Sequence, residues 1–152
     1  MRGLALLIAT MMGIGRIPFA PGTAASLAVF LVFFPLRECF FLKWSLVAGL
    51  IVVGVWASGE AEKALGLRDP SSVVIDEAAG MALVMAFFPQ AGWITLVSGL
   101  LLFRIFDILK PFPIRNLEKF PAGWGIVADD LGAAFYALAV LKLAKAALPG
   151  WL

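Results

Sequence analysis

Long runs without a charged residue dominate this chain and limit how it can fold. They cover residues 18–36, 44–59, 78–103 and 131–141, and a turn-like Pro-Gln-Ala-Gly group interrupts the third. Charged residues make up 14% of the 152 residues, against about 25% in soluble domains. A globule of this size has too little interior to hide so much apolar surface from water. We therefore expect one membrane domain over residues 1–152.

The expected fold is all-α and polytopic, with about five spanning helices and a short N-terminal helix over residues 1–12. Because about 20 residues are needed to span a bilayer, the helices must continue into their charged ends. The spans are expected near residues 23–36, 44–58, 77–89, 92–107 and 130–148. With five spans, the polar segments between them all emerge on one face. Eight of the 12 Arg and Lys residues belong to that face, which predicts that it is cytoplasmic.

The acidic residues are sorted in the same way. Nine of the ten belong to the predicted cytoplasmic face, and Glu38 is the exception. A helical bundle does not need this arrangement, and ionisable residues at a membrane are often functional. The chain has no histidine, and its single Cys39 excludes an internal disulfide and a multi-Cys zinc site. A net charge of +2 without a basic stripe predicts no nucleic-acid partner.

One candidate for anion binding is the segment GIGRIPFAPGT, residues 13–23. Its glycines and prolines oppose a regular helix and let backbone N–H groups point at an anion. Arg16 adds a fixed charge, and Thr23 lies where the next helix starts, so the positive helix end adds to the field. The simpler alternative is an ordinary turn with Thr23 as the helix N-cap.

A second candidate is FRIFDILKPFPIRNLEK, residues 103–119. It places Arg104, Asp107 and Lys110 near a helix end at spacings that let neighbouring members share a face. Arg115 follows with a planar guanidinium suited to phosphate. The alternative is a basic rim at the membrane surface, with the aspartate in a salt bridge.

Two adjacent carboxylate pairs are candidates for metal binding: Asp76-Glu77 at the entrance to an apolar helix, and Asp129-Asp130, which open the last helix. Helix capping stabilises an acid by about 0.3–1 kcal/mol, but an ionised Asp at bilayer depth costs about 2.5–3.5 kcal/mol. Capping therefore accounts for one member of each pair but hardly for both. A hard cation such as Mg²⁺ would offset the charge of both members. With Asp107, the pairs would form a cation site beside the anion site, as phosphoryl chemistry requires.

Four stretches of the chain resemble, in order, the phosphatidylglycerophosphatase A family, which comprises Mg²⁺-dependent lipid phosphatases of bacterial membranes. They are GIGRIPFAPGTAASL (13–27), DPSSVVIDEAAG (69–80), FRIFDILKPFPIR (103–115) and GWGIVADDLGAA (123–134). The chain departs from the family pattern at residues 24–26 and at Val127, and neither departure touches a charged position. The resemblance implies an all-helical enzyme that hydrolyses phosphatidylglycerol phosphate to phosphatidylglycerol and inorganic phosphate. It also implies that the enzyme lies in the bacterial inner membrane, with the active site facing the cytoplasm.

Roles for individual residues follow from this interpretation. The predicted Mg²⁺ ligands, direct or through water, are Asp76, Glu77, Asp129 and Asp130. The predicted catalytic residues are Asp76, Asp107, Asp129 and Asp130, with Asp107 completing or orienting the metal shell. The predicted phosphate-binding residues are Arg16, Thr23, Arg104, Lys110 and Arg115.

Attack on phosphorus could come from a metal-bound water or from an aspartate that becomes phosphorylated. The absence of a DxDx(T/V) motif favours water. Other classes are a small-ion or anion transporter and a non-catalytic assembly factor. A transporter would prefer polar residues near the midplane and often an inverted repeat, and an assembly factor has no use for these carboxylates. A CDP-alcohol phosphatidyltransferase would carry DxxDGxxAR, which is missing.

Overall fold

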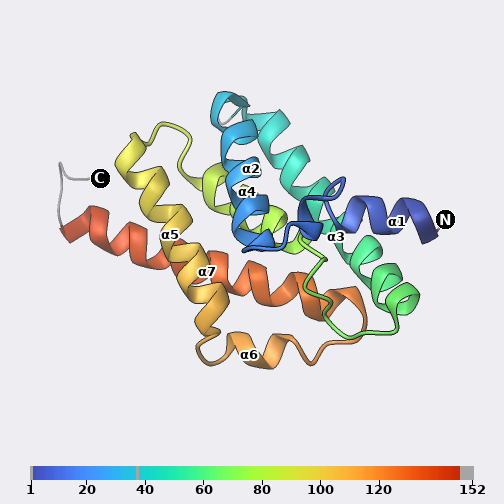
Figure 1. Cartoon of the computed structure of the whole chain (residues 1–152). Coiled ribbons are helices and arrows are strands. Elements are labelled where there is room, and N and C mark those ends of the chain that lie inside the picture. Colours follow the sequence, from blue (N-terminus) through green and yellow to red (C-terminus); the bar gives the residue numbers. More distant parts are fainter. Residues whose placement is uncertain (1, 37, 148–152) are drawn as a thin grey trace.

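The computed structural model describes residues 2–36 and 38–147, and these residues form helices and no strands (Figure 1). The elements in order are α1 (Arg2–Ala9), a 3₁₀ turn (Ile14–Arg16), α2 (Pro21–Leu36), α3 (Phe40–Leu65), α4 (Ile75–Phe87), α5 (Trp93–Leu109), α6 (Ile114–Leu117) and α7 (Gly123–Ala147). The all-helical prediction is confirmed. The final residue of the segment expected at 130–148 lies outside the described residues.

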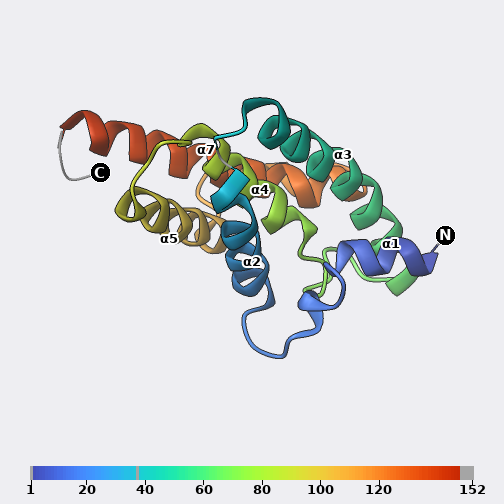
Figure 2. The ribbon, with the colours of Figure 1, turned by 90° about the horizontal axis from the view of Figure 1, so that it is seen from above.

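Helix α4 is the centre of the bundle. Eleven of its 13 residues are buried, and it packs against α2, α3, α5 and α7, which surround it in two perpendicular views (Figures 1 and 2). Gly80 permits the close approach, since a Cβ there would lie 2.6 Å from the Phe103 ring and 3.1 Å from the Asp130 carbonyl oxygen. The N-terminal half of α4 is therefore held next to α5 and α7.

Helix α3 has the composition of a membrane-spanning helix. It is 26 residues long, and its most apolar window has a mean hydropathy of 1.9 with 22% of that window buried. Among the described residues it is the one helix that is long and apolar enough to cross a membrane, while α2 is apolar but shorter. Helix length therefore does not confirm about five spans, and that number stays a prediction. Exposed apolar side chains do cover the outer helices, among them Leu31, Val52, Leu101 and Leu143.

Helix α7 begins earlier than expected. It starts at Gly123, so Asp129 and Asp130 lie in its second turn and do not open it. The prediction that this pair opens the last helix, with one member as the cap, is wrong. The reason is that Gly123 serves close packing: a Cβ there would overlap the carbonyl oxygen of Val55 and lie 2.6 Å from the amide nitrogen of Gly59.

Candidate active site

A pocket of about 400 Å³ opens where α2 and α4 begin and α5 ends. Its wall combines the first turn of α2, the loop before α4, the first turn of α4, the last turns of α5 and the second turn of α7. These parts belong to the polar segments that the sequence predicts on one face. The acidic lining residues are Asp69, Asp76, Glu77, Asp107, Asp129 and Asp130, and the basic ones are Arg104 and Lys110. Because six carboxyl groups face only two cationic side chains, the pocket favours the binding of additional positive charge.

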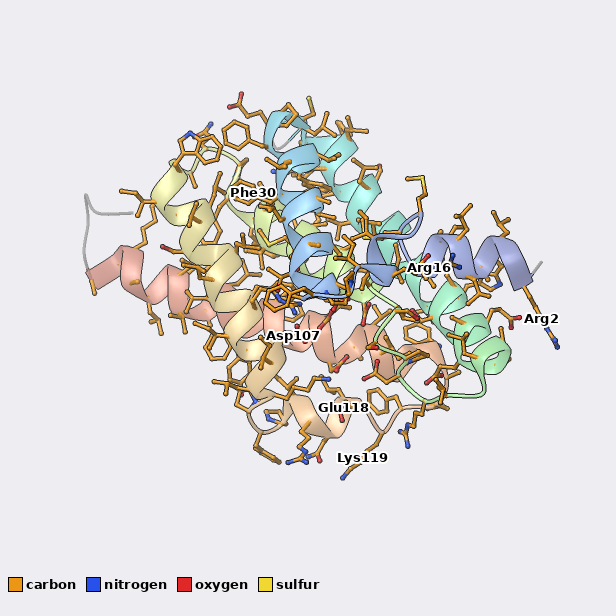
Figure 3. All side chains as sticks on the ribbon, in the orientation of Figure 1. Arg2, Arg16, Phe30, Asp107, Glu118 and Lys119 are labelled. Carbon is orange, nitrogen blue, oxygen red and sulfur yellow. The ribbon has the colours of Figure 1, made fainter. Side chains whose placement is uncertain are left out.

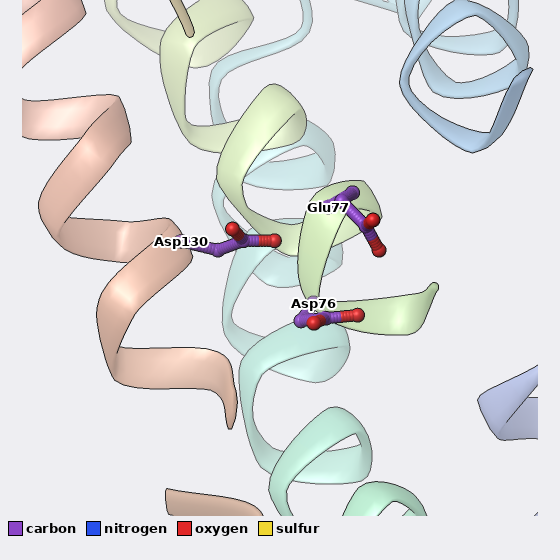
Figure 4. Close-up of side chains that lie close together, drawn as sticks. All are labelled: Asp76, Glu77 and Asp130. Carbon is purple, nitrogen blue, oxygen red and sulfur yellow. The ribbon is translucent and has the colours of Figure 1, made fainter. Parts of the chain in front are cut away.

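Three of the acidic side chains, Asp76, Glu77 and Asp130, form a compact group that we call the carboxylate cluster (Figure 4). One oxygen atom of each lies within 4.8 Å of an oxygen of the others. The first two come from the first turn of α4 and the third from α7 (Figure 4). The sequence therefore identified three members of one cluster that are up to 54 positions apart in the chain, since 130 − 76 = 54.

In the carboxylate cluster, one buried oxygen of each side chain has no hydrogen-bond partner among the described residues. Asp76 is 7% exposed and Asp130 2% exposed. Asp76 Oδ1, Glu77 Oε2 and Asp130 Oδ2 are buried and accept no hydrogen bond from the described residues. An ionised carboxylate left in this state costs several kcal/mol. Carboxylate oxygens are the hard donors that Mg²⁺ takes from proteins, so the chemistry of the cluster fits the predicted ion.

The first turn of α2 presses against the carboxylate cluster. A Cβ on Gly22 would overlap Oε1 of Glu77 and lie 3.0 Å from Nη2 of Arg104. Glycine is therefore required for the backbone to come this close. The first amides of a helix have no partner within it and favour an anion, and Thr23 lines the same pocket. The structure thus brings the predicted anion-binding segment to the pocket through α2.

Arg104 joins the carboxylate cluster to the end of α5. Its Nη1 lies 2.6 Å from Asp107 Oδ2, one helical turn away, and 3.7 Å from Glu77 Oε1. All three side chains are largely buried. Asp107 therefore holds the guanidinium at the edge of the cluster, and its predicted role in the metal shell stays a prediction.

Lys110 binds Asp129, which is not one of the three residues of the carboxylate cluster. Its Nζ donates to Asp129 Oδ2 at 2.5 Å and to Glu118 Oε1 at 2.6 Å. Burial disfavours the ammonium, but the hydrogen bonds and charges of these two carboxylates outweigh it and raise the pKa of Lys110. The sequence reasoning missed the partnership with Glu118, because it depends on the turn that α6 makes. Asp129, predicted as a metal ligand, is placed with this lysine.

Asp69 lines the pocket but was not predicted as a site residue. It lies in the loop before α4, where its backbone N–H donates to Glu62 Oε1 at 3.0 Å. Burial raises the pKa of Asp69, and the positive charge of Lys110 opposes the shift. The turn formed by Asp69, Pro70 and Ser71 thus brings a further acid to the pocket.

Two predicted phosphate ligands lie elsewhere. Arg16 is exposed on the 3₁₀ turn, away from Asp107 (Figure 3), and does not line the pocket. Arg115 on α6 lines a neighbouring groove of about 970 Å³, which shares Asp69 with the pocket. Among the predicted phosphate ligands, the structure therefore brings Thr23, Arg104 and Lys110 together. Phosphate binding by the other two stays a prediction.

Replacing Lys110 with Met is expected to lower the free energy of unfolding by about 2–3 kcal/mol, because Asp129 would keep its buried charge without a cation. While Asp129 is ionised, the raised pKa of Lys110 makes the stabilisation by its ammonium complete below the unfolded value of about 10.4, and this stabilisation declines only as pH rises towards the folded value. Lys63, 66% exposed and paired with Glu60 at 2.8 Å, gives the matched control. Lys63→Met should change stability by less than about 0.5 kcal/mol. Denaturation in mild detergent measures the free energy of unfolding of both variants. Equal losses of stability in the two variants would contradict the pairing of Lys110 with a buried Asp129.

Comparison with known protein families gives a match over most of the chain. The family model described as phosphatidylglycerophosphatase A matches residues 7–145. Phosphatidylglycerophosphatase A of Haemophilus influenzae is 38% identical, covering 89% of this chain and 85% of its own length. The Escherichia coli protein of the same name is 32% identical, and the match covers 89% of this chain and 80% of that protein.

A third relative carries a different name. A Bacteroides thetaiotaomicron protein, provisionally named a phosphatidylinositol-3-phosphatase, is 36% identical and covers 93% of this chain and 94% of its own length. No solved structure matches the chain. The family match spans all the segments that build the pocket. The chain belongs to the phosphatidylglycerophosphatase A family and is a phosphatase that acts on a phosphate monoester.

Proposed function

We propose that the protein removes the terminal phosphate of phosphatidylglycerol phosphate in a reaction that depends on Mg²⁺. The relatives named phosphatidylglycerophosphatase A support the substrate. The observation that carries the metal proposal is the trio of buried carboxylate oxygens in the carboxylate cluster, which have no partner among the described residues. A cation there would offset the unpaired negative charge that the fold otherwise buries at a cost.

Within this proposal, Asp76, Glu77 and Asp130 hold the ion. When bound, Mg²⁺ supplies positive charge to the phosphate and makes a water molecule more acidic. Arg104, oriented by its ion pair at 2.6 Å with Asp107, faces the phosphate from the edge of the cluster. The free amides in the first turn of α2 bind a second side of the same anion. These donors together neutralise the charge that the phosphate carries as its ester bond breaks.

We propose that water, and not an aspartate of the chain, attacks phosphorus. Asp107 and Asp129 are the pocket acids outside the cluster on helices α5 and α7, and both are already engaged. Asp107 pairs with Arg104, and Asp129 accepts a hydrogen bond from Lys110. A carboxylate held by a cation is a weaker nucleophile than a free one. Lys110 then stays charged beside the pocket and stabilises the leaving oxygen.

We also propose that the protein is a multi-pass protein of the bacterial inner membrane with its active site facing the cytoplasm. The exposed apolar residues on α2, α3, α5 and α7 support a lipid environment for the outer helices. The excess of Arg and Lys on the polar face supports the orientation. The pocket lies at the helix ends on that face, where the headgroup of a membrane lipid can reach it.

The test is phosphate release by the detergent-purified protein from phosphatidylglycerol phosphate and, in parallel, from phosphatidylinositol 3-phosphate. With Mg²⁺ we expect release from the first lipid, a fall of about 100-fold with excess chelator, and recovery when Mg²⁺ is restored. Phosphate release at the same rate with and without the chelator would overturn the metal proposal. Release from the inositol lipid alone would overturn the substrate.

A further inference from the structure

The pocket borders an exposed apolar surface. Thr23 on α2 and Ile108 on α5 both line it, and both are exposed, Ile108 by 69%. Two perpendicular views place α2 and α5 side by side, on the same side of α4 and α7 (Figures 1 and 2). The polar pocket therefore opens between two helices whose outer surfaces face away from the bundle.

From that opening, apolar side chains continue along both helices. On α5, exposed apolar residues recur every three or four positions at Ile94, Val97, Leu101, Ile105 and Ile108. On α2, Thr23 is followed at intervals of four by the exposed Leu27 and Leu31. These spacings keep each set on one side of its helix. We call the two sets together the α2–α5 face.

Aromatic rings close the far end of this face. The rings of Phe34 on α2 and Trp93 on α5 stack with centroids 4.4 Å apart, and Phe30 lies 5.8 Å from the same Trp93 ring. From Thr23 to Phe34 the helix rises about 16 Å at 1.5 Å per residue. That length is close to half of the roughly 30 Å hydrocarbon core, which is the depth of one leaflet.

We propose that an acyl chain of the substrate lipid lies along the α2–α5 face while its phosphate occupies the pocket, an inference that rests on the proposed function. The charged pocket suits a phosphate, the apolar face suits a hydrocarbon chain, and the two meet at Thr23 and Ile108. Other exposed apolar residues, such as Val52 on α3, do not border the pocket. The lipid therefore enters sideways from the bilayer between α2 and α5, and its tail never leaves the membrane.

Photo-crosslinking of the wild-type protein in vesicles tests this entry route directly. One probe is phosphatidylglycerol phosphate with a diazirine in its acyl chain, and the other is phosphatidylcholine with the same chain and no phosphomonoester. We expect the first probe to label the α2–α5 face several-fold more than the second does, with equal labelling of α3 around Val52. Equal labelling of the α2–α5 face by the two probes, or enrichment along α3, would overturn the proposal.

A variant gives an independent measurement. In Leu101→Asn, the ratio of kcat/KM for a long-chain substrate to that for a water-soluble short-chain analogue should fall about fivefold to tenfold, because apolar contact with the chain is lost. Val52→Asn places the same polar group on α3 and should retain the wild-type ratio. An unchanged ratio in folded Leu101→Asn would count against the proposal. Phosphate release by the wild-type protein decides the proposed function separately, since the crosslinking pattern does not require turnover.

Discussion

Asp130→Asn is expected to reduce phosphate release at least about 10³-fold while the bundle stays folded. Asparagine keeps the volume of the side chain but removes the charge that helps to hold the metal. Asp130 is 2% exposed, and its Oδ2 has no partner among the described residues. Without metal, the variant should be at least as stable as the wild type, because one of several crowded buried carboxylates is gone.

Two measurements separate this outcome from a general loss of structure. Mg²⁺ should raise the thermal midpoint of the wild type through selective binding to the folded state, and this increase should be absent in Asp130→Asn. The matched control is Glu60→Gln, an acid on α3 that pairs with Lys63 outside the pocket. It should keep both the activity and the response to Mg²⁺. Near wild-type activity in Asp130→Asn would show that Asp130 is not part of the active site.

Gly22→Ala is expected to lower kcat/KM by about 100-fold, an effect of misplaced catalytic groups. The added Cβ would overlap Oε1 of Glu77 and crowd Arg104, so either the start of α2 or the Glu77 side chain must move. Alanine is the better helix former by about 1 kcal/mol, which compensates part of the cost of the shift. Activity should therefore fall much more than the free energy of unfolding.

Gly49→Ala is the control for Gly22→Ala, because a Cβ at Gly49 in α3 meets no atom within 4 Å. It changes the same residue type inside a helix, away from the pocket, and activity should be unaffected. Steady-state kinetics and detergent denaturation of the two variants give the comparison. A Gly22→Ala enzyme with full activity would show that the close approach of α2 to Glu77 has no role in the reaction.

The location of the site was predictable because charge and apolar pattern act over short stretches. Asp76 and Glu77 lie in the first turn of α4, as the apolar run after them predicts. Arg104 and Asp107 lie in the last turns of α5, which ends at Leu109 before the first proline. Charged side chains are unfavourable along the apolar middle of a helix and are therefore found near its ends. The charged residues of α4 and α5 accordingly lie at the helix ends that line the pocket.

The sequence did not show which of the two adjacent acids on α7 would join the carboxylate cluster and which would pair with Lys110. Adjacent residues on a helix point about 100° apart, so one of Asp129 and Asp130 faces α4 and the other faces Lys110, and the choice depends on the rotation of α7. That rotation depends on how α7 packs against its neighbours, and the sequence pattern did not assign Gly123 to this helix. In the fold it is a contact point with α3. Tertiary packing of this kind leaves no local signal in the chain.

The burial of α4 has a consequence for how the protein is made. Its 13 residues give a rod about 20 Å long, well short of the roughly 30 Å that a lone helix must cover. This helix also carries Asp76 and Glu77, which are unfavourable in lipid. A nascent chain that has not yet released α7 from the ribosome lacks one of the walls that enclose it. In the proposed membrane arrangement, α4 is therefore expected to integrate only when α7 can enclose it, and the same packing brings Asp130 to the carboxylate cluster.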